Sequence, residues 1–390
     1  MKHLLIVAGF LLGLLFLLAQ CTANKGNPVG SQFFQRENQG SEMYALFHAA
    51  ASDTFYQTFV ANGSSPYLYL GQCNGKKTWS LILFSNLPDS GTVDSALVTL
   101  HTHHIFGQTS GFFTASVHLI LKEWNPTEIT WETFDNSFIG EEIANVEISA
   151  DQISANNDTM ALSFHLPPAT VQSWIDSTTD SLNYGILLMY QSAPFIVEFF
   201  SNNTEELEYR PTLTIYLKQD TTKEGSVTYP RKDTFIASTE QEPNFTRLFV
   251  NNGTALRSLI YFSIDSLPED ATINRALLTL HADTLLSFPD NESFDLITYP
   301  VTNNTWPIPA VPFDSTTMGW STLEGDSISI NVTNIVQKWT SGKNENYGFI
   351  LMGKNEKRDI FGRAFYSTSC DSLYQPTLEI FYSLPPNSRL

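Results

Sequence analysis

The sequence of 390 residues carries 21 basic and 40 acidic side chains, which gives a formal net charge of −19 at neutral pH. A chain this acidic disfavours a phosphate-binding surface, so nucleic acid is excluded as a ligand class. Aromatic residues make up 13% of the chain and only 16% of residues are charged. Long amphipathic helical patterns are absent, which favours a β protein.

The N-terminal segment has the pattern of an export signal. Lys2 precedes an almost uninterrupted apolar run from Leu4 to Leu18, which is short for a membrane span and typical of a secretory signal peptide. The run closes on LLAQC, which resembles a bacterial lipobox, although Gln20 stands where Gly or Ala is usual. We therefore expect residues 1–20 to be a signal peptide and Cys21 to carry a lipid that anchors the exported protein to the cell envelope. Ordinary cleavage and secretion is the alternative.

The segment 21–42 is polar and is expected to be a tether. Beyond it, short runs of alternating polar and apolar residues are separated by turn signals such as LPDSG, the pattern of an antiparallel sandwich or jelly roll. One short helix is expected around 170–176, with Val171 and Trp174 facing the sheet. The runs that predict strands lie at 77–85, 93–103, 113–122, 160–166, 184–190 and 212–217.

The second half of the chain repeats the first. NYGILLM at 183–189 returns as NYGFILM at 346–352, and Asp53-Thr54-Phe55 returns as Asp233-Thr234-Phe235. Several such matches in the same order indicate a duplicated domain. The fold class expected is therefore all-β, with two tandem sandwich or jelly-roll domains that each hold one short helix. The bounds expected are 43–218 for copy one, 219–230 for a linker, 231–384 for copy two and 385–390 for a tail. The second helix is expected around 334–340, with Trp339 in the core.

Two tyrosines of copy one are candidates for ligand contact. In Tyr67-Leu68-Tyr69-Leu70 the two-residue period of a strand places both Tyr on the face opposite both Leu. If the Leu pair is core, the Tyr pair faces solvent, where flat rings can stack on sugar rings. The matching residues of copy two are Arg247 and Phe249. The alternative is ordinary cross-strand packing on an outer sheet face.

Two tryptophans are further candidates. Trp124 and Trp131 flank the segment NPTEIT, where an indole could stand free for a ligand or lie in the core. We leave both readings open.

Three patterns are compatible with a metal ion or a disulfide bond but predict neither. His101 and His103 share a strand face, and copy two has His281 and Asp283 there, all capable of binding zinc or copper. Asp53 and Asp233 either accept hydrogen bonds from turn amides or hold a structural calcium. Cys73 and Cys370 lie in different copies, with no spacing that demands a disulfide. No cofactor or metal site is predicted, and structural calcium is the one metal left open.

The cluster KNEKRD at 354–359 concentrates charge in copy two, where most basic residues lie. It is either a solvated turn or a contact patch for an acidic ligand.

The collinear motifs resemble a known family. The order is an Asp-x-Phe strand, an Ala-Leu-x-x-Leu strand, a Trp-x-x-x-x-x-Thr-Trp segment, a Val-x-x-Trp helix, a Gly-[Ile/Phe]-x-Leu strand and a closing Pro-Thr-Leu strand. This order is similar to the DNRLRE-type module, grouped with the carbohydrate-binding modules. The resemblance covers both copies and implies a non-catalytic β-sandwich on exported proteins that binds polysaccharide.

Enzyme motifs are missing from the sequence. There is no Gly-x-Ser-x-Gly elbow, no His-Glu-x-x-His and no phosphate-cradling loop. We therefore expect a surface-anchored polysaccharide-binding protein that is not an enzyme. The alternative is a structural or adhesive cell-surface protein that contacts other proteins without binding glycan.

Overall fold

The computed structural model describes residues 43–156, 159–176, 183–218, 224–240, 246–289, 292–304, 306 and 311–385. The expected signal peptide, the lipidation site Cys21, the tether and nearly all of the tail lie outside the described residues. Within the described ranges, no helix is long and apolar enough to cross a membrane.

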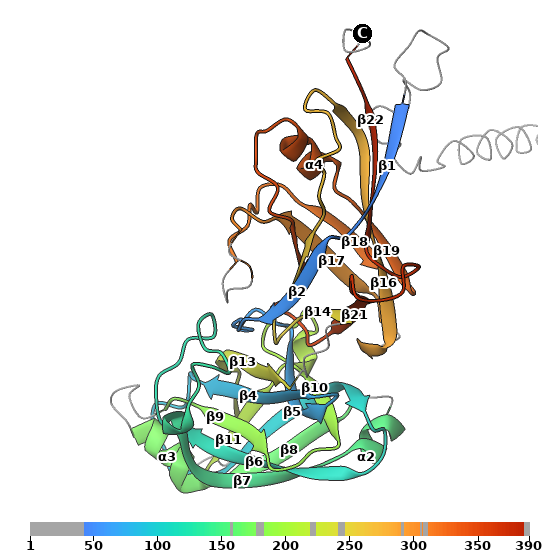
Figure 1. The fold of residues 1–390 in the computed structure, drawn as a ribbon. Coiled ribbons are helices and arrows are strands. Elements are labelled where there is room, and N and C mark those ends of the chain that lie inside the picture. Colours follow the sequence, from blue (N-terminus) through green and yellow to red (C-terminus); the bar gives the residue numbers. More distant parts are fainter. Residues whose placement is uncertain are drawn as a thin grey trace, which may run out of the picture.

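The chain forms two antiparallel sheets, each curled into a sandwich, as the sequence predicts (Figure 1). The long strands β5 (Val93–Gly107) and β16 (Thr272–Phe288) each pair with both layers of their sandwich. The other strands of the first sandwich are β3 (Tyr67–Cys73), β4 (Lys76–Phe84), β6 (Phe112–Ile120), β7 (Ile139–Ser149), β8 (Ala161–Leu166), β9 (Ile186–Tyr190), β10 (Phe195–Phe200), β11 (Thr212–Leu217), β12 (Ser226–Thr228) and β13 (Pro230–Thr239). Those of the second are β1 (Met43–Ala49), β2 (Ser52–Gln57), β14 (Arg247–Asn251), β15 (Leu256–Tyr261), β17 (Phe294–Pro300), β18 (Gly319–Leu323), β19 (Ser327–Asn331), β20 (Phe349–Gly353), β21 (Gly362–Tyr366) and β22 (Thr377–Ser383).

The two predicted helices are present as α3 (Pro168–Asp176) and α4 (Thr333–Thr340). Trp174 and Trp339 are buried at 7% and 6% exposure within the cores of their sandwiches, which confirms their assignment to the core. The first sandwich has a further short helix, α2 (Ala150–Ala155), which the sequence analysis missed. Its cap is Ser149, whose side chain accepts a hydrogen bond from the Gln152 amide.

The sheets divide the chain differently from the expected bounds. β2 pairs with β15, so the first strand of copy one lies in the second sandwich, and β1 pairs with β22 there. β13 of copy two pairs with β4 in the first sandwich, and β12 pairs with β11. Figure 1 shows blue β1 and β2 along the orange and red domain, and yellow-green β13 with blue β4. Domain 1 is therefore 58–240, and domain 2 is 43–57 together with 246–385.

This exchange has a simple origin in the sequence. The first strands of the two copies share Asp-Thr-Phe, at Asp53 and at Asp233, so each sandwich offers an edge that either strand can fill. The segment expected to be a linker at 219–230 includes β12, which completes the sheet of domain 1. Domain 1 is consequently one continuous stretch of chain inserted between β2 and β14 of domain 2.

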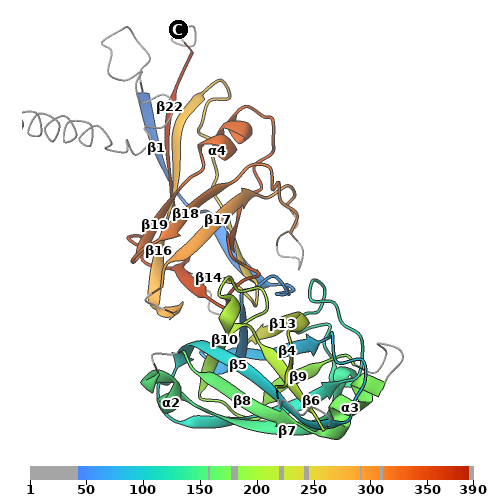
Figure 2. The same cartoon turned by 180° about the vertical axis from the view of Figure 1, so that it is seen from behind.

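The two domains share an apolar contact. In both views β14 of domain 2 lies close to β10 and β13 of domain 1 (Figures 1 and 2). Domain 1 contributes Tyr69, Phe106 and Ile196 from its outer face, and Phe235 and Ala237 from β13. Domain 2 contributes Phe288 and Ile360. Lys76 is only 3% exposed beside them, its ammonium lies 5.7 Å from the Phe288 ring centre, and burial lowers its pKa to about 7.

Cys73 and Cys370 are free thiols. The two sandwiches are thus in contact through apolar side chains, and these two cysteines form no disulfide bond between them.

Candidate binding site between the domains

The outer face of β3 is the starting point for the site. Leu68 and Leu70 belong to the core of domain 1, so Tyr67 and Tyr69 point to the opposite face, as the strand period predicts. The expectation that both tyrosines face solvent is nevertheless wrong for Tyr69, which has 0% exposure. The reason is that Phe235 of the exchanged strand β13, together with Phe288 and Ile360 of domain 2, covers this part of the face, a contact that a single-copy strand pattern cannot reveal.

Tyr69 and His103 converge on a buried carboxylate. The Tyr69 hydroxyl donates to Glu198 Oε1 over 2.5 Å, and His103 Nδ1 lies 2.6 Å from Glu198 Oε2. Glu198 itself is 3% exposed. Burial and the adjacent Glu198 charge raise the pKa of Tyr69 well above its usual value, so this phenol stays protonated and keeps donating.

Tyr67 is the partly exposed member of the pair. Its ring stacks on the His103 imidazole with centroids 4.6 Å apart and an interplanar angle of 22°. Phe200 lies behind both rings, with its centroid 4.8 Å from that of His103 and 6.0 Å from that of Tyr67. The stacked rings are held by this packing, so Tyr67 offers a fixed flat surface to a ligand.

A cavity of about 500 Å³ opens at Tyr67, between the domains. Its lining combines flat rings with carboxylates, imidazoles and one guanidinium: Pro66, Tyr67, Tyr69, His103, His104, Phe106, Glu198, Glu292, Asn355, Arg358, Asp359 and Phe361. We call it the interdomain pocket.

Domain 2 contributes to the interdomain pocket through the turn at 354–359. The Ser65 hydroxyl of domain 1 donates to the Arg358 carbonyl over 2.6 Å, which fixes this turn against the rim. Burial raises the pKa of Asp359 to about 6, against hydrogen bonds from the Asn252 amide group and the Phe361 backbone that favour the carboxylate. The pocket therefore presents a carboxyl group that changes charge in mildly acidic solution.

The candidate tryptophans have structural positions. Trp124 is 3% exposed, and its indole Nε1 donates to the Tyr184 carbonyl over 2.8 Å. The Lys232 ammonium lies 4.7 Å from the Trp124 ring centre and donates to the Trp124 carbonyl. Trp131 is half-buried and packs against Trp79, with centroids 4.7 Å apart. Both indoles cover the outer face of domain 1, away from the interdomain pocket. The interpretation of Trp124 and Trp131 as core residues therefore fits better than ligand contact.

The matching pair of copy two is also engaged within the fold. Arg247 forms an ion pair of 2.7 Å with Asp283, and its guanidinium lies 4.1 Å from the Tyr366 ring centre. Phe249 is 2% exposed and packs edge-on against Phe55, with centroids 5.2 Å apart. The strand exchange buries Phe249, because Phe55 comes from β2. Neither Arg247 nor Phe249 therefore offers an accessible ring like that of Tyr67.

The structure gives little support to a metal site at these positions. Among the described residues, no group of three His, Cys, Asp or Glu side chains is placed to hold a metal ion. His101 Nδ1 lies 3.3 Å from the Tyr209 carbonyl, and His103 is directed at Glu198. Asp53 and Asp233 accept hydrogen bonds from the backbone amides of Thr368 and Asn202. The structure therefore confirms the interpretation that the two aspartates accept hydrogen bonds from turn amides.

The sequence analysis missed two members of the pocket's surroundings. Glu198 looked like one acidic residue in an apolar strand, FIVEFF, and its position in a strand buried on both faces was the available signal. The turn at 354–359 belongs to the other copy, so nothing local linked it to Tyr67.

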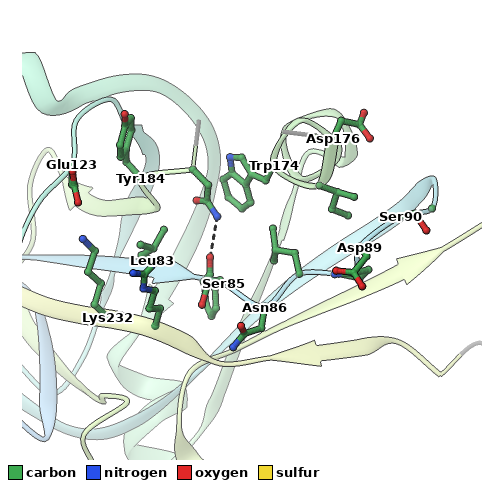
Figure 3. Close-up of a pocket in the computed structure, with 17 residues that line it drawn as sticks. Leu83, Ser85, Asn86, Asp89, Ser90, Glu123, Trp174, Asp176, Tyr184 and Lys232 are labelled. Atoms are coloured by element: carbon green, nitrogen blue, oxygen red, sulfur yellow. Dashed lines mark hydrogen bonds between the residues drawn. The ribbon is translucent and has the colours of Figure 1, made fainter. Parts of the chain in front are cut away.

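A larger cavity, of about 830 Å³, lies at one end of domain 1 (Figure 3). Figure 3 shows Trp174 between a group of Glu123, Tyr184 and Lys232 on one side and Asp89 with Asp176 on the other. Its polar groups are used to hold the fold: the Asn183 amide donates to the Phe84 carbonyl over 2.9 Å, and Lys232 donates to Trp124. With Trp174 mostly in the core, this cavity offers a poorer flat surface than the interdomain pocket.

No family model and no curated protein match the chain. Among solved structures, the chain is similar to the N-terminal CBM22-1-CBM22-2 tandem domain of Xyn10C from Paenibacillus barcinonensis. The identity is 8%, the match covers 89% of this chain and 98% of that one, and the TM-score is 0.14. At this score the likeness carries no argument, and the fold and site rest on the geometry described above.

Proposed function

We propose that this chain is a non-catalytic, exported protein that binds polysaccharide in the interdomain pocket and is anchored to the cell envelope through a lipid on Cys21. The observation that carries the proposal is the stack of Tyr67 on His103 beside the buried Glu198. Apolar C–H faces of a sugar ring pack on such a ring, while nearby carboxylates and imidazoles exchange hydrogen bonds with its hydroxyl groups.

The pocket suits recognition of a sugar within a polymer. It lies between two sandwiches and draws its lining from both. A ligand bound there contacts both domains, so binding depends on how the two domains are placed relative to each other. The motif resemblance to the DNRLRE-type module agrees with this function, and it rests on the quoted residues alone.

The test uses the full chain and a panel of immobilised neutral and acidic polysaccharides. Tyr67→Ala is expected to weaken binding by about tenfold, near 1.4 kcal/mol, because it removes the stacking surface. Tyr229→Ala is the matched control, since Tyr229 is 50% exposed and lies outside the pocket. Equal binding by both variants, or no binding to any polysaccharide, would rule the proposal out. Labelled fatty acid that enters the wild-type chain but not Cys21→Ser would establish the anchor.

The adhesive alternative has one observation in its favour. β1 is an edge strand that carries exposed apolar side chains, with Phe47 at 71% exposure and Met43 at 50%. Such an edge can pair with a strand of another protein. Capture of a protein partner that Phe47→Lys abolishes, without glycan binding, would favour this alternative.

A further inference from the structure

A lysine and an asparagine from different domains meet inside the contact between the two sandwiches. Lys76 begins β4 of domain 1 and is 3% exposed, and Asn251 ends β14 of domain 2 and is 6% exposed. In the amide orientation that satisfies both of its ends, the Asn251 side-chain oxygen accepts from Lys76 Nζ over 3.1 Å, and the nitrogen donates to the Val250 carbonyl over 3.1 Å. The amine of one domain therefore touches the carboxamide of the other.

The sheet of domain 2 leaves a fitted space for this pair. Gly362 of β21 lies opposite Asn251. A Cβ at position 362 would lie 1.8 Å from the end of the Asn251 amide and 3.3 Å from Lys76 Nζ, so a larger residue there would displace both groups. Because a C=O bond is about 1.2 Å long, Asn251 Cγ lies at most about 4.3 Å from Lys76 Nζ. Reacting atoms in productive complexes lie about 3–3.5 Å apart, so a small movement brings the two atoms into reach.

The surroundings of Lys76 favour an uncharged amine. Its Nζ lies 5.7 Å from the Phe288 ring centre, at the edge of the apolar contact. Burial lowers the pKa of Lys76 to about 7; the charges of Asp359 and Cys73 oppose this shift and the Arg363 guanidinium adds to it. An ordinary lysine, with a pKa of about 10.4, is almost fully charged at neutral pH, whereas a large fraction of Lys76 side chains carry a free lone pair there.

Asp359 places a carboxyl group close enough for its charge to act on Lys76. The Asn252 side chain and the Phe361 backbone amide each donate to it over 2.8 Å. Burial raises the pKa of Asp359 to about 6, near that of the amine. A carboxyl group matched in this way can take a proton from one nitrogen and return it to another, as a general acid–base catalyst does.

We propose that Lys76 and Asn251 form an isopeptide bond that joins the two domains covalently. The neutral Lys76 Nζ attacks Asn251 Cγ, the Nζ–Cγ bond forms and the Cγ–Nδ2 bond breaks. Nδ2 leaves as ammonia with the proton that Nζ gives up, and Asp359 carries that proton between the two nitrogens. One amine and one primary amide thus become one secondary amide and ammonia, so the reaction needs no oxidant, reductant or co-reactant.

The bond has two consequences for the molecule. It replaces a buried amine, which is costly to bury when charged, with a neutral amide. It also fixes how the two domains lie relative to each other, whichever ligand the interdomain pocket takes. In a cross-linked chain Lys76 no longer titrates, so the pH dependence of a free Lys76 amine belongs to chains in which the bond has not formed.

The test is mass spectrometry of the purified full chain after denaturation, because an amide survives unfolding and a hydrogen bond does not. We expect the wild-type mass to lie below that of the uncross-linked variants by one ammonia, once the mass of each substitution is subtracted. Proteolysis is expected to yield one branched peptide, in which fragmentation finds Lys76 Nζ joined to Asn251 Cγ.

Four variants, each first shown by circular dichroism to unfold cooperatively, localise the reaction. Lys76→Arg and Asn251→Ala remove one reacting group each and are expected to keep the ammonia. Asp359→Asn is expected to leave most of the chain uncross-linked. Lys77→Arg is the matched control, since Lys77 is the neighbouring lysine, pairs with Glu240 at the surface and is expected to leave the bond intact.

The outcomes decide the matter even if a variant fails to fold. A wild-type chain at full mass, without a branched peptide, would overturn the proposal. Loss of ammonia that persists in Lys76→Arg would also overturn it, because a succinimide at an Asn-Gly step such as Asn74-Gly75 gives the same mass. Cross-linking to the wild-type extent in Asp359→Asn would remove Asp359 from the reaction. A branched peptide that Lys77→Arg keeps and Lys76→Arg lacks would establish the bond.

Discussion

The Asp53 carboxylate accepts a hydrogen bond of 2.5 Å from the backbone amide of Thr368, 315 residues further along the chain. The equivalent bond in the other sandwich joins Asp233 to the Asn202 amide over 2.7 Å. In each case the aspartate comes from the first strand of one copy and the amide from the other. The folding unit therefore differs from the sequence repeat.

Fragments that follow the sheets are expected to fold, and fragments that follow the repeat are not. Residues 58–240 contain β13, whose Phe235 and Ile236 are 0% and 1% exposed. The fragment 58–218 loses both side chains, each of which contributes about 1.5–3 kcal/mol by burial, and leaves the edge of β4 unpaired. Thermal unfolding followed by circular dichroism is expected to give a cooperative transition for 58–240 only. A comparable transition for 58–218, or for 43–218, would contradict the exchanged topology.

Tyr67 and Tyr69 are expected to respond in opposite ways to substitution. Tyr69→Phe removes the donor to Glu198 and leaves a buried carboxylate with one partner fewer, at a cost of about 1.5–3 kcal/mol. Tyr67→Ala removes a partly exposed ring, so it is expected to reduce glycan binding with a smaller effect on stability. Urea unfolding of the two variants measures the contrast. A larger loss of stability for Tyr67→Ala would mean that the structural roles are reversed.

Stability is expected to fall as the pH rises from about 4 to about 7, through Asp233. Burial raises the pKa of Asp233 to about 7 from an ordinary value of 3.8. Across that window the folded state keeps a proton that the unfolded state has lost, so a rise in pH favours unfolding, and the effect levels off above pH 7. Burial shifts the pKa of Asp359 in the same direction.

Asp233→Asn tests this dependence because the amide oxygen can still accept the bond from Asn202. We expect the variant to lose much of the slope between pH 4 and pH 7 in urea unfolding, whereas the exposed Asp94→Asn keeps it. An unchanged slope in Asp233→Asn would show that other groups set the pH dependence.

As a free amine, Lys76 is expected to make stability depend on pH in the adjoining range, above about pH 7. Burial lowers its pKa to about 7 from 10.5. Below about pH 7 the ammonium is charged in both states and the cost of burying it is fully present. Between about 7 and 10.5 the folded state has released the proton and the cost disappears, so stability rises with pH. Lys76→Met is expected to flatten this rise and to stabilise the protein at pH 7, measured by differential scanning calorimetry. An equal rise in the variant would refute the assignment.

The fold class and the core were predictable because alternation and duplication are local properties of the sequence. The positions of Trp174 and Trp339 on short helices followed from spacing alone. The face assignment of Leu68 and Leu70 against Tyr67 and Tyr69 followed from the strand period. None of these depends on how the two copies contact each other.

The site was only partly predictable because it depends on contacts between copies. Tyr69 is buried by Phe235, with ring centroids 4.7 Å apart, and Phe235 comes from the exchanged strand. The edges at β4 and β15 can each pair with either of two near-identical strands, β2 and β13. The sequence alone does not show which strand pairs with which edge.

The most direct test of polysaccharide binding in the interdomain pocket is hydrogen–deuterium exchange of the full chain with and without the best-bound polysaccharide. The account predicts protection at 66–69, 103–106 and 355–361, and loss of that protection in Tyr67→Ala. Protection confined to the cavity of Figure 3, around Asp89, Trp174 and Tyr184, would contradict it and move the site to the end of domain 1.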